Sequence, residues 1–178
     1  MYLHITTGTV SYLHDVFEKH HGLSMNAIGQ DAVLYYEDDT TDTLFNSKRT
    51  YNVLCGGGNL NDQYPTVIST IPVAHSSHDS TIGHLKDFHY SLEKQSGLIS
   101  HRIGELVDGD SFVVITTWAS KTAYKDFKDT DSYQKYLKTD VLHKYRNAES
   151  LFQDYISSKL YLPLKDNVHI DEEEQAEF

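Results

Sequence analysis

Residues 111–127 read SFVVITTWASKTAYKDF, and this stretch decides the fold. It begins as an apolar run rich in β-branched residues, which favours a buried strand ending at Trp118. It continues as a helix pattern, because Tyr124 and Phe127 fall on one helical face. Ser120 lies at the junction and can cap the helix by accepting a hydrogen bond from a backbone N–H of the first turn. The stretch therefore predicts a strand, a cap and a helix in direct succession.

The elements around this stretch extend it into a β-α-β-β-α-(α)-β order. Asp108-Gly109-Asp110 predicts a tight hairpin turn before it. The order is close to that of ferredoxin-like domains, an α+β class in which helices cover one face of an antiparallel sheet. The pattern predicts strands over 65–74, 98–107, 111–118 and 151–162, and helices over 82–95, 120–128 and 133–146.

The second face of this sheet also needs a cover. Alternate residues of the strand at 111–118 would be exposed there, either Val113 and Ile115 or Phe112 and Val114. A second copy of the chain would bury them, so we predict a homodimer.

The N-terminal part has shorter elements. It predicts a β-rich unit over 1–55 with one helix over 10–20, a glycine-rich linker over 56–63 and a ferredoxin-like domain over 64–163. Residues 165–178 hold six acids and one base, which predicts a disordered acidic tail over 164–178. Predicted strands lie at 2–7, 24–28, 32–37 and 43–46, and residues 50–54 fit a strand or a helix.

Composition narrows the function classes. The chain has 178 residues and a net charge of −11, which argues against nonspecific nucleic-acid binding. No apolar run approaches the roughly 20 residues that span a membrane, and the first residues lack a signal-peptide pattern, so a cytoplasmic location is expected. The single cysteine, Cys55, excludes an intramolecular disulfide.

The strand ending at Trp118, the helix after it and the following Ser132-Tyr133 resemble the antibiotic biosynthesis monooxygenase (ABM) superfamily over residues 64–163. The whole chain is similar to two-part members, namely heme-degrading monooxygenases with a β-rich N-terminal extension and TRAP-type proteins. Residues 2–9 and 155–163 fit that layout. The resemblance implies a dimeric α+β barrel with a pocket between sheet and helices, monooxygenase activity, and heme or a small hydrophobic molecule as the ligand.

Heme-degrading relatives place an Asn on the first strand of the domain, a Trp on the helix after the signature strand, and an iron-binding His on the next helical segment. By resemblance these positions fall here at Ser69, Phe127 and Leu137, so all three residues differ from the pattern. Trp118 is no substitute, because it belongs to the signature strand. The sequence does not determine the cofactor, and heme is the candidate that the resemblance implies.

Three other side chains, His143, His89 and Tyr136, are candidate ligand contacts. His143 follows Leu137 by six residues and would reach the same site only if the helix is broken. His89 lies on an apolar helix face, where a core histidine with satisfied ring nitrogens is the favoured interpretation. Tyr136 is the third candidate. His75, His78, Asp79 and His84 match no standard metal-site spacing, and caps explain that segment.

Two functional hypotheses follow. The first is a monooxygenase, of the heme-degrading type or independent of a cofactor. The second is a non-enzymatic regulatory or small-ligand-binding protein of the TRAP type on the same fold. The substitutions at the three family positions favour the second, and the fold alone does not decide between them.

Overall fold

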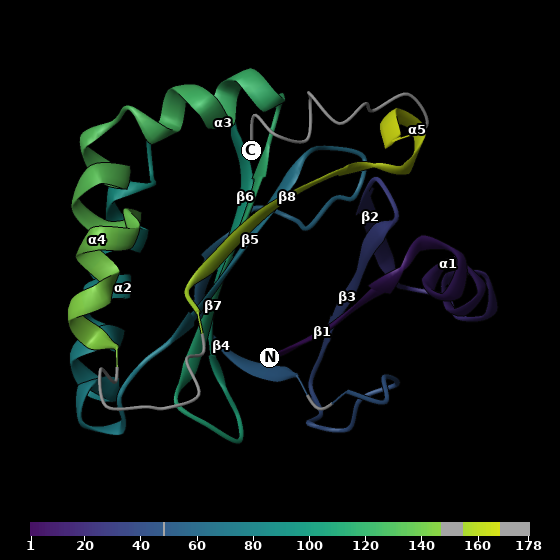
Figure 1. The fold of residues 1–178 in the computed structure, drawn as a ribbon, viewed down its shortest axis with the longest axis horizontal. Helices are drawn as coiled ribbons and strands as arrows, with labels where there is room; N and C mark the ends of the chain where they lie inside the picture. The colour runs from purple at the N-terminus through teal and green to yellow at the C-terminus, as the bar shows by residue number, and fades with distance from the viewer. Residues whose placement is uncertain (48, 147–154, 168–178) are drawn as a thin grey trace.

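The computed structural model describes residues 1–47, 49–146 and 155–167. Strands and short helical segments make up its elements (Figure 1). The strands are β1 (Tyr2–Thr9), β2 (Ser24–Ile28), β3 (Asp31–Asp38), β4 (Thr50–Gly57), β5 (Thr66–Pro72), β6 (Leu98–Leu106), β7 (Ser111–Trp118) and β8 (Ser157–Pro163). The helical elements are α1 (Val10–Lys19), η1 (His75–Ser77), α2 (His78–Ser91), α3 (Lys121–Lys128), η2 (Tyr133–Leu137), α4 (Thr139–Leu142), η3 (His143–Tyr145) and α5 (Leu164–Asn167).

The strands form one closed antiparallel barrel in the order β1-β3-β2-β8-β5-β7-β6-β4. β1–β4 come from the N-terminal part and β5–β8 from the C-terminal part. The two sets meet where β2 pairs with β8 and where β4 pairs with β6. The predicted α+β class is therefore correct, and a single chain closes the barrel.

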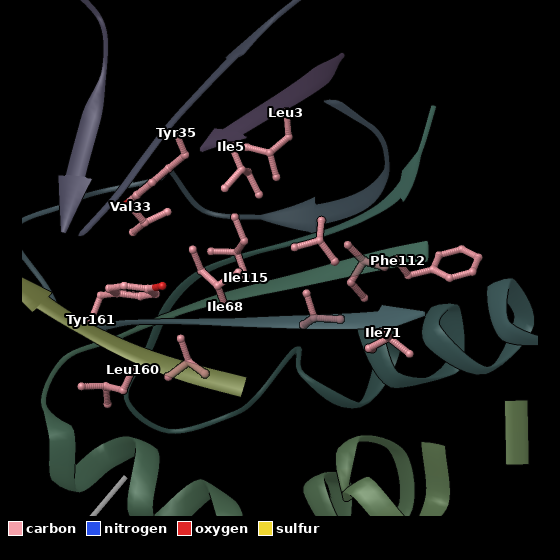
Figure 2. Close-up of a cluster of buried hydrophobic side chains, with 14 of the residues drawn as sticks. Leu3, Ile5, Val33, Tyr35, Ile68, Ile71, Phe112, Ile115, Leu160 and Tyr161 are labelled. Atoms are coloured by element: carbon pink, nitrogen blue, oxygen red, sulfur yellow. The ribbon is translucent and has the colours of Figure 1, made fainter. Parts of the chain in front are cut away.

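The sequence predicts an open sheet face that a second copy of the chain would cover. That prediction is wrong, because the closed barrel leaves no such face open. Val113 and Ile115 face the barrel interior, whereas Phe112 and Val114 face the helices, and all four are buried within one chain. Figure 2 shows the labelled side chains of β1 and β3 across from Ile68 and Ile115, so the N-terminal strands cover the sheet face that had been expected to be open.

Two helical layers flank the barrel. In Figure 1, α2, α3 and α4 lie on one side and α1 lies on the opposite side. Under α1, a separate core joins the helix to the outer faces of β2 and β3. The buried residues of this core are Leu13, Met25, Ala27, Ala32, Leu34 and Phe45.

No helix in the described part of the chain is long and apolar enough to span a membrane.

Several local predictions are confirmed. Ser120 caps α3, and its hydroxyl accepts a hydrogen bond from the Ala123 amide at 3.1 Å. Residues 108–110 form the turn between the hairpin strands β6 and β7.

The glycine run at 56–58 does not behave as the linker that was predicted to begin there. Gly56 and Gly57 are the last residues of β4 and pair with β6. A Cβ on Gly56 would lie 2.7 Å from the carbonyl oxygen of His101, and Gly58 has a φ of +69°. Glycine is needed here for close strand contact and for a left-handed turn. The division into two domains stays a prediction.

Other boundaries also differ. Residues 43–46 form bends instead of a strand, and the last strand begins at Ser157. The helix predicted over 133–146 is broken at Lys138, whose ψ of 134° is extended. The first four residues of the predicted tail form α5, and Asn167 there hydrogen-bonds the backbone of Gly29. The rest of that tail and the start of the predicted last strand lie outside the described residues.

Candidate functional site

The helix-facing side of the barrel carries Ser69, the first of the three positions expected from the resemblance. Ser69 lies on β5 opposite Val114 of β7. Because strand side chains alternate, Ser69 faces the same side as Phe112, whose ring lies 4.9 Å from that of His78 on α2. Ser69 is buried, and its hydroxyl hydrogen-bonds the Ser158 hydroxyl at 2.7 Å. A neighbouring strand therefore already satisfies this hydroxyl.

The second family position, Phe127, lies at the centre of a group of aromatic rings between β7 and the helices. Phe127 is 0% exposed. Its ring centroid lies 4.7 Å from that of Trp118, 5.7 Å from that of Tyr133 and 6.4 Å from that of Phe88. Such centroid separations are typical of packed aromatic pairs. We call this group the aromatic layer, and it comprises Phe88, Trp118, Tyr124, Phe127, Tyr133 and Tyr136.

Burial also sets the charge state of the aromatic layer. It raises the pKa of the Tyr124 phenol well above its ordinary value, and the neighbouring Tyr133 raises it further. Burial raises the pKa of the Tyr133 phenol as well. Both groups are therefore neutral at neutral pH. The Trp118 indole N–H donates to the Thr116 hydroxyl at 2.9 Å, so its polar atom is satisfied within β7.

The third family position, Leu137, ends a short π-helical turn in which the Lys138 amide donates to the Tyr133 carbonyl at 2.9 Å. Leu137 is partly buried against the core that contains Phe127. His143 can reach the same site as Leu137 only if the helix breaks between the two residues. The break is present, but His143 is exposed.

The other two candidate contacts have partners within the chain. His89 Nδ1 lies 2.8 Å from His101 Nε2, a hydrogen bond between α2 and β6. Tyr136 belongs to the aromatic layer, and its carbonyl oxygen lies 2.9 Å from His84 Nε2. Burial lowers the pKa of His84 and lowers that of His101 to about 4, with the nearby His89 adding to the effect on His101. His84 and His101 are therefore neutral at neutral pH.

The histidines at the start of α2 form ion pairs. His78 bridges two carboxylates, with Nε2 3.0 Å from Glu105 and Nδ1 3.1 Å from Asp110. His75 also contacts Asp110, at 3.1 Å. Hydrogen bonding to Glu105 is the main cause that raises the pKa of His78. Among the described residues, no group of three histidine, cysteine or acidic side chains is arranged to hold a metal ion.

The barrel interior offers a different site. Two cavities, of about 600 Å³ and 480 Å³, lie at one end of the barrel, and no residue of the aromatic layer lines either of them. Arg49 and Thr70 line both cavities. The sequence patterns did not identify Arg49. One signal was available, because Lys48-Arg49 are the first lysine or arginine residues after Lys19 and follow an acidic segment.

Comparison with known families and proteins agrees with this layout. Residues 66–139 match the model of the antibiotic biosynthesis monooxygenase family. The chain is 23% identical over 168 residues to the signal transduction protein TRAP of Staphylococcus epidermidis, covering 94% of this chain and 100% of that protein. It is 24% identical over 177 residues to TRAP of Staphylococcus aureus, covering 92% and 98% of the two chains.

Solved structures share the fold across both parts of the chain. A major regulator of staphylococcal pathogenesis superposes with a TM-score of 0.79 at 20% identity, covering 92% of this chain and 99% of that one. A heme-degrading enzyme from Listeria monocytogenes superposes with a TM-score of 0.71 at 18% identity, covering 91% and 99%. Residues 66–139 therefore resemble the antibiotic biosynthesis monooxygenase family, and the fold of the chain is that of these structures.

Proposed function

We propose that this chain is a non-enzymatic, small-ligand-binding or regulatory protein of the TRAP type, built on the ABM scaffold. The observation that carries the proposal is the environment of Phe127. The ring is fully buried and is surrounded by the aromatic layer, at the residue that the sequence resemblance aligns with the Trp of heme-degrading relatives.

The residues present do not fit a heme held in the manner of the heme-degrading relatives. Ser69 is hydrogen-bonded to Ser158, and Leu137 has no atom that can bind iron. His143 is exposed and His89 is hydrogen-bonded to His101. We therefore derive no step that passes through heme. Likeness in length and layout to TRAP proteins supports the proposal further.

Titration with hemin tests this proposal. Purified protein is titrated while the Soret band is recorded, and ascorbate is then added in air. We expect no stoichiometric Soret shift and no protein-dependent loss of the band. A shift followed by loss of the band would support a heme oxygenase and contradict the proposal. If His143→Ala abolished such a shift, that residue would be the iron ligand.

The second candidate function is a cofactor-independent monooxygenase, and the match to the monooxygenase family favours it. Its test is oxygen uptake by the protein with phenolic or polycyclic aromatic substrates, recorded with an oxygen electrode. Turnover that is lost in Tyr136→Phe would favour this function over the first. The cytoplasmic location and the homodimer expected from the sequence stay predictions.

A further inference from the structure

One end of the barrel opens into a polar site that is separate from the aromatic layer. At this end β4, β7 and β8 begin, while β5 and β6 finish. The two cavities meet here around Arg49 and Thr70, and the larger has the volume of a small-molecule pocket. We call this site the barrel mouth, and its main residues are Thr7, Arg49, Thr70, Ser157, Lys159 and Tyr161.

The lining of the barrel mouth is amphipathic. Hydroxyl groups come from Thr7, Thr70 and Ser157 on three different strands. Ile5 and Ile68, both buried, supply apolar surface in the same cavity. A ligand with a polar head and a short apolar body matches both kinds of surface.

The charges of the barrel mouth indicate which polar head it would accept. Lys159 is already paired, because its ammonium lies 2.5 Å from the Asp31 carboxylate. Asp110, in the smaller cavity, accepts from His75 and His78. The guanidinium of Arg49 has neither an ion pair nor a hydrogen bond among the residues that the structure describes.

Arg49 is held in place through its backbone. Its carbonyl accepts a hydrogen bond from the Ile5 amide at 3.1 Å, which ties the residue to β1, and it is partly buried. The position therefore brings an uncompensated positive charge to the barrel mouth of a chain whose net charge is −11. Partly buried charges in proteins are normally paired, and a guanidinium matches a carboxylate through two parallel hydrogen bonds.

We propose that the barrel mouth binds a small organic monocarboxylate, with the carboxylate on the Arg49 guanidinium and the apolar part against Ile5 and Ile68. A monoanion fits better than a phosphate dianion, because Arg49 is the single uncompensated cation among the described lining residues and Asp31 and Asp110 lie in the two cavities. The proposal does not depend on the function proposed above, since no residue of the aromatic layer takes part.

The test is calorimetric titration of the full chain with hexanoate, hexanol and hexyl phosphate. We expect hexanoate to bind and the other two probes to bind at least about 10-fold more weakly. Arg49→Gln should weaken hexanoate binding by about 10- to 100-fold, because a charge-assisted pair is lost. Lys94→Gln is the matched control, since Lys94 is an exposed cation that lines neither cavity, and it should bind hexanoate as the natural chain does.

A second measurement uses the natural chain and so does not depend on the variant folding. Hexanoate should slow the modification of Arg49 by phenylglyoxal, followed by mass spectrometry, and leave Arg102 unaffected, because Arg102 is paired with Glu37 and lines neither cavity. Equal binding of hexanol, tighter binding of hexyl phosphate, unprotected Arg49, or no binding of hexanoate at millimolar concentration would each overturn the proposal.

Discussion

Phe127 lies at the centre of the aromatic layer on the helix-facing side of the barrel. Its ring packs on Trp118 and on Tyr133, and it is fully buried. The pattern of the sequence placed Phe127 on the inner face of its helix. The same pattern does not predict how closely the other rings of the aromatic layer pack around Phe127. Those rings come from α2, α3, η2 and β7, which are separate in the sequence.

We predict that Phe127→Ala lowers the free energy of unfolding by about 3–5 kcal/mol, because the truncation leaves a cavity in a packed core. Urea denaturation measures the change. Tyr90→Ala on α2 is the matched control, since the Tyr90 side chain is 67% exposed, and it should change stability by less than about 0.5 kcal/mol. Equal effects of the two substitutions would show that Phe127 is not packed in this way.

His101 gives a prediction about acid. Its folded pKa is about 4, against about 6.5 in the unfolded chain, chiefly because it is buried. The unfolded chain therefore binds the proton more tightly. The contribution of His101 to stability is complete above pH 6.5 and is lost as the pH falls toward 4, by up to about 3 kcal/mol.

His101→Gln should accordingly lose less stability than the natural chain between pH 7 and pH 4.5, as measured by urea denaturation at both values. His20→Gln, at an exposed position, serves as the control and should keep the natural pH dependence. If His101→Gln and the natural chain lost stability in parallel, the buried neutral state of His101 would be disproved.

At the scale of elements, β4 illustrates why a local pattern can mislead. Three successive glycines are typical of a flexible connection. Here Gly56 and Gly57 extend a strand, because the backbone of β6 lies too close for a side chain at Gly56. That reason lies in another strand, about 45 residues further along the chain, so the glycine run alone does not reveal it.

Two glycine substitutions test this reading. Gly56→Ala should destabilise the protein by about 1–3 kcal/mol, because the added Cβ would lie 2.7 Å from the His101 carbonyl oxygen. Gly83→Ala is the control, since Gly83 lies within α2 with nothing within 4 Å of an added Cβ, and it should stabilise by about 0.5–1 kcal/mol. Thermal melts of both variants give the comparison, and the same shift in both would reject a close contact at Gly56.

The segment at 133–146 is a second case at this scale. The apolar spacing predicted one helix, and the structure has three short helical pieces with a break at Lys138. The break lets Tyr136, Leu142 and Tyr145 all pack against the core. The sequence carries no proline or glycine there, so neither of the usual helix breakers marks the break.

At the scale of the whole molecule, most of the strands and the α+β class could be predicted, whereas closure of the barrel within one chain could not. Closure depends on pairing β2 with β8 and β4 with β6, and these strands are far apart in the sequence. The barrel mouth was hidden for the same reason. Its lining comes from β1, β3, β5, β8 and the segment before β4, which only the closed barrel brings together.

Closure by one chain predicts that folding does not need a partner. Protein that light scattering shows to be monomeric should still fold and should melt at the same temperature from about 1 to 100 µM, whereas an obligate dimer becomes more stable as its concentration rises. Circular dichroism at several concentrations measures this, with light scattering to record the mass at each one. A melting temperature that rises with concentration would show that association completes the fold.

Trp118 is the single tryptophan, and it lies in the aromatic layer with no exposed surface. Its fluorescence during hemin addition therefore tests most directly whether this layer is a heme site, because a heme bound there would quench the indole by energy transfer. N-acetyltryptophanamide under the same conditions corrects for light absorbed by free hemin. We predict corrected emission that is unchanged through one equivalent of hemin. Quenching that saturates at one equivalent would show stoichiometric heme binding and contradict the claim that the residues present do not fit heme.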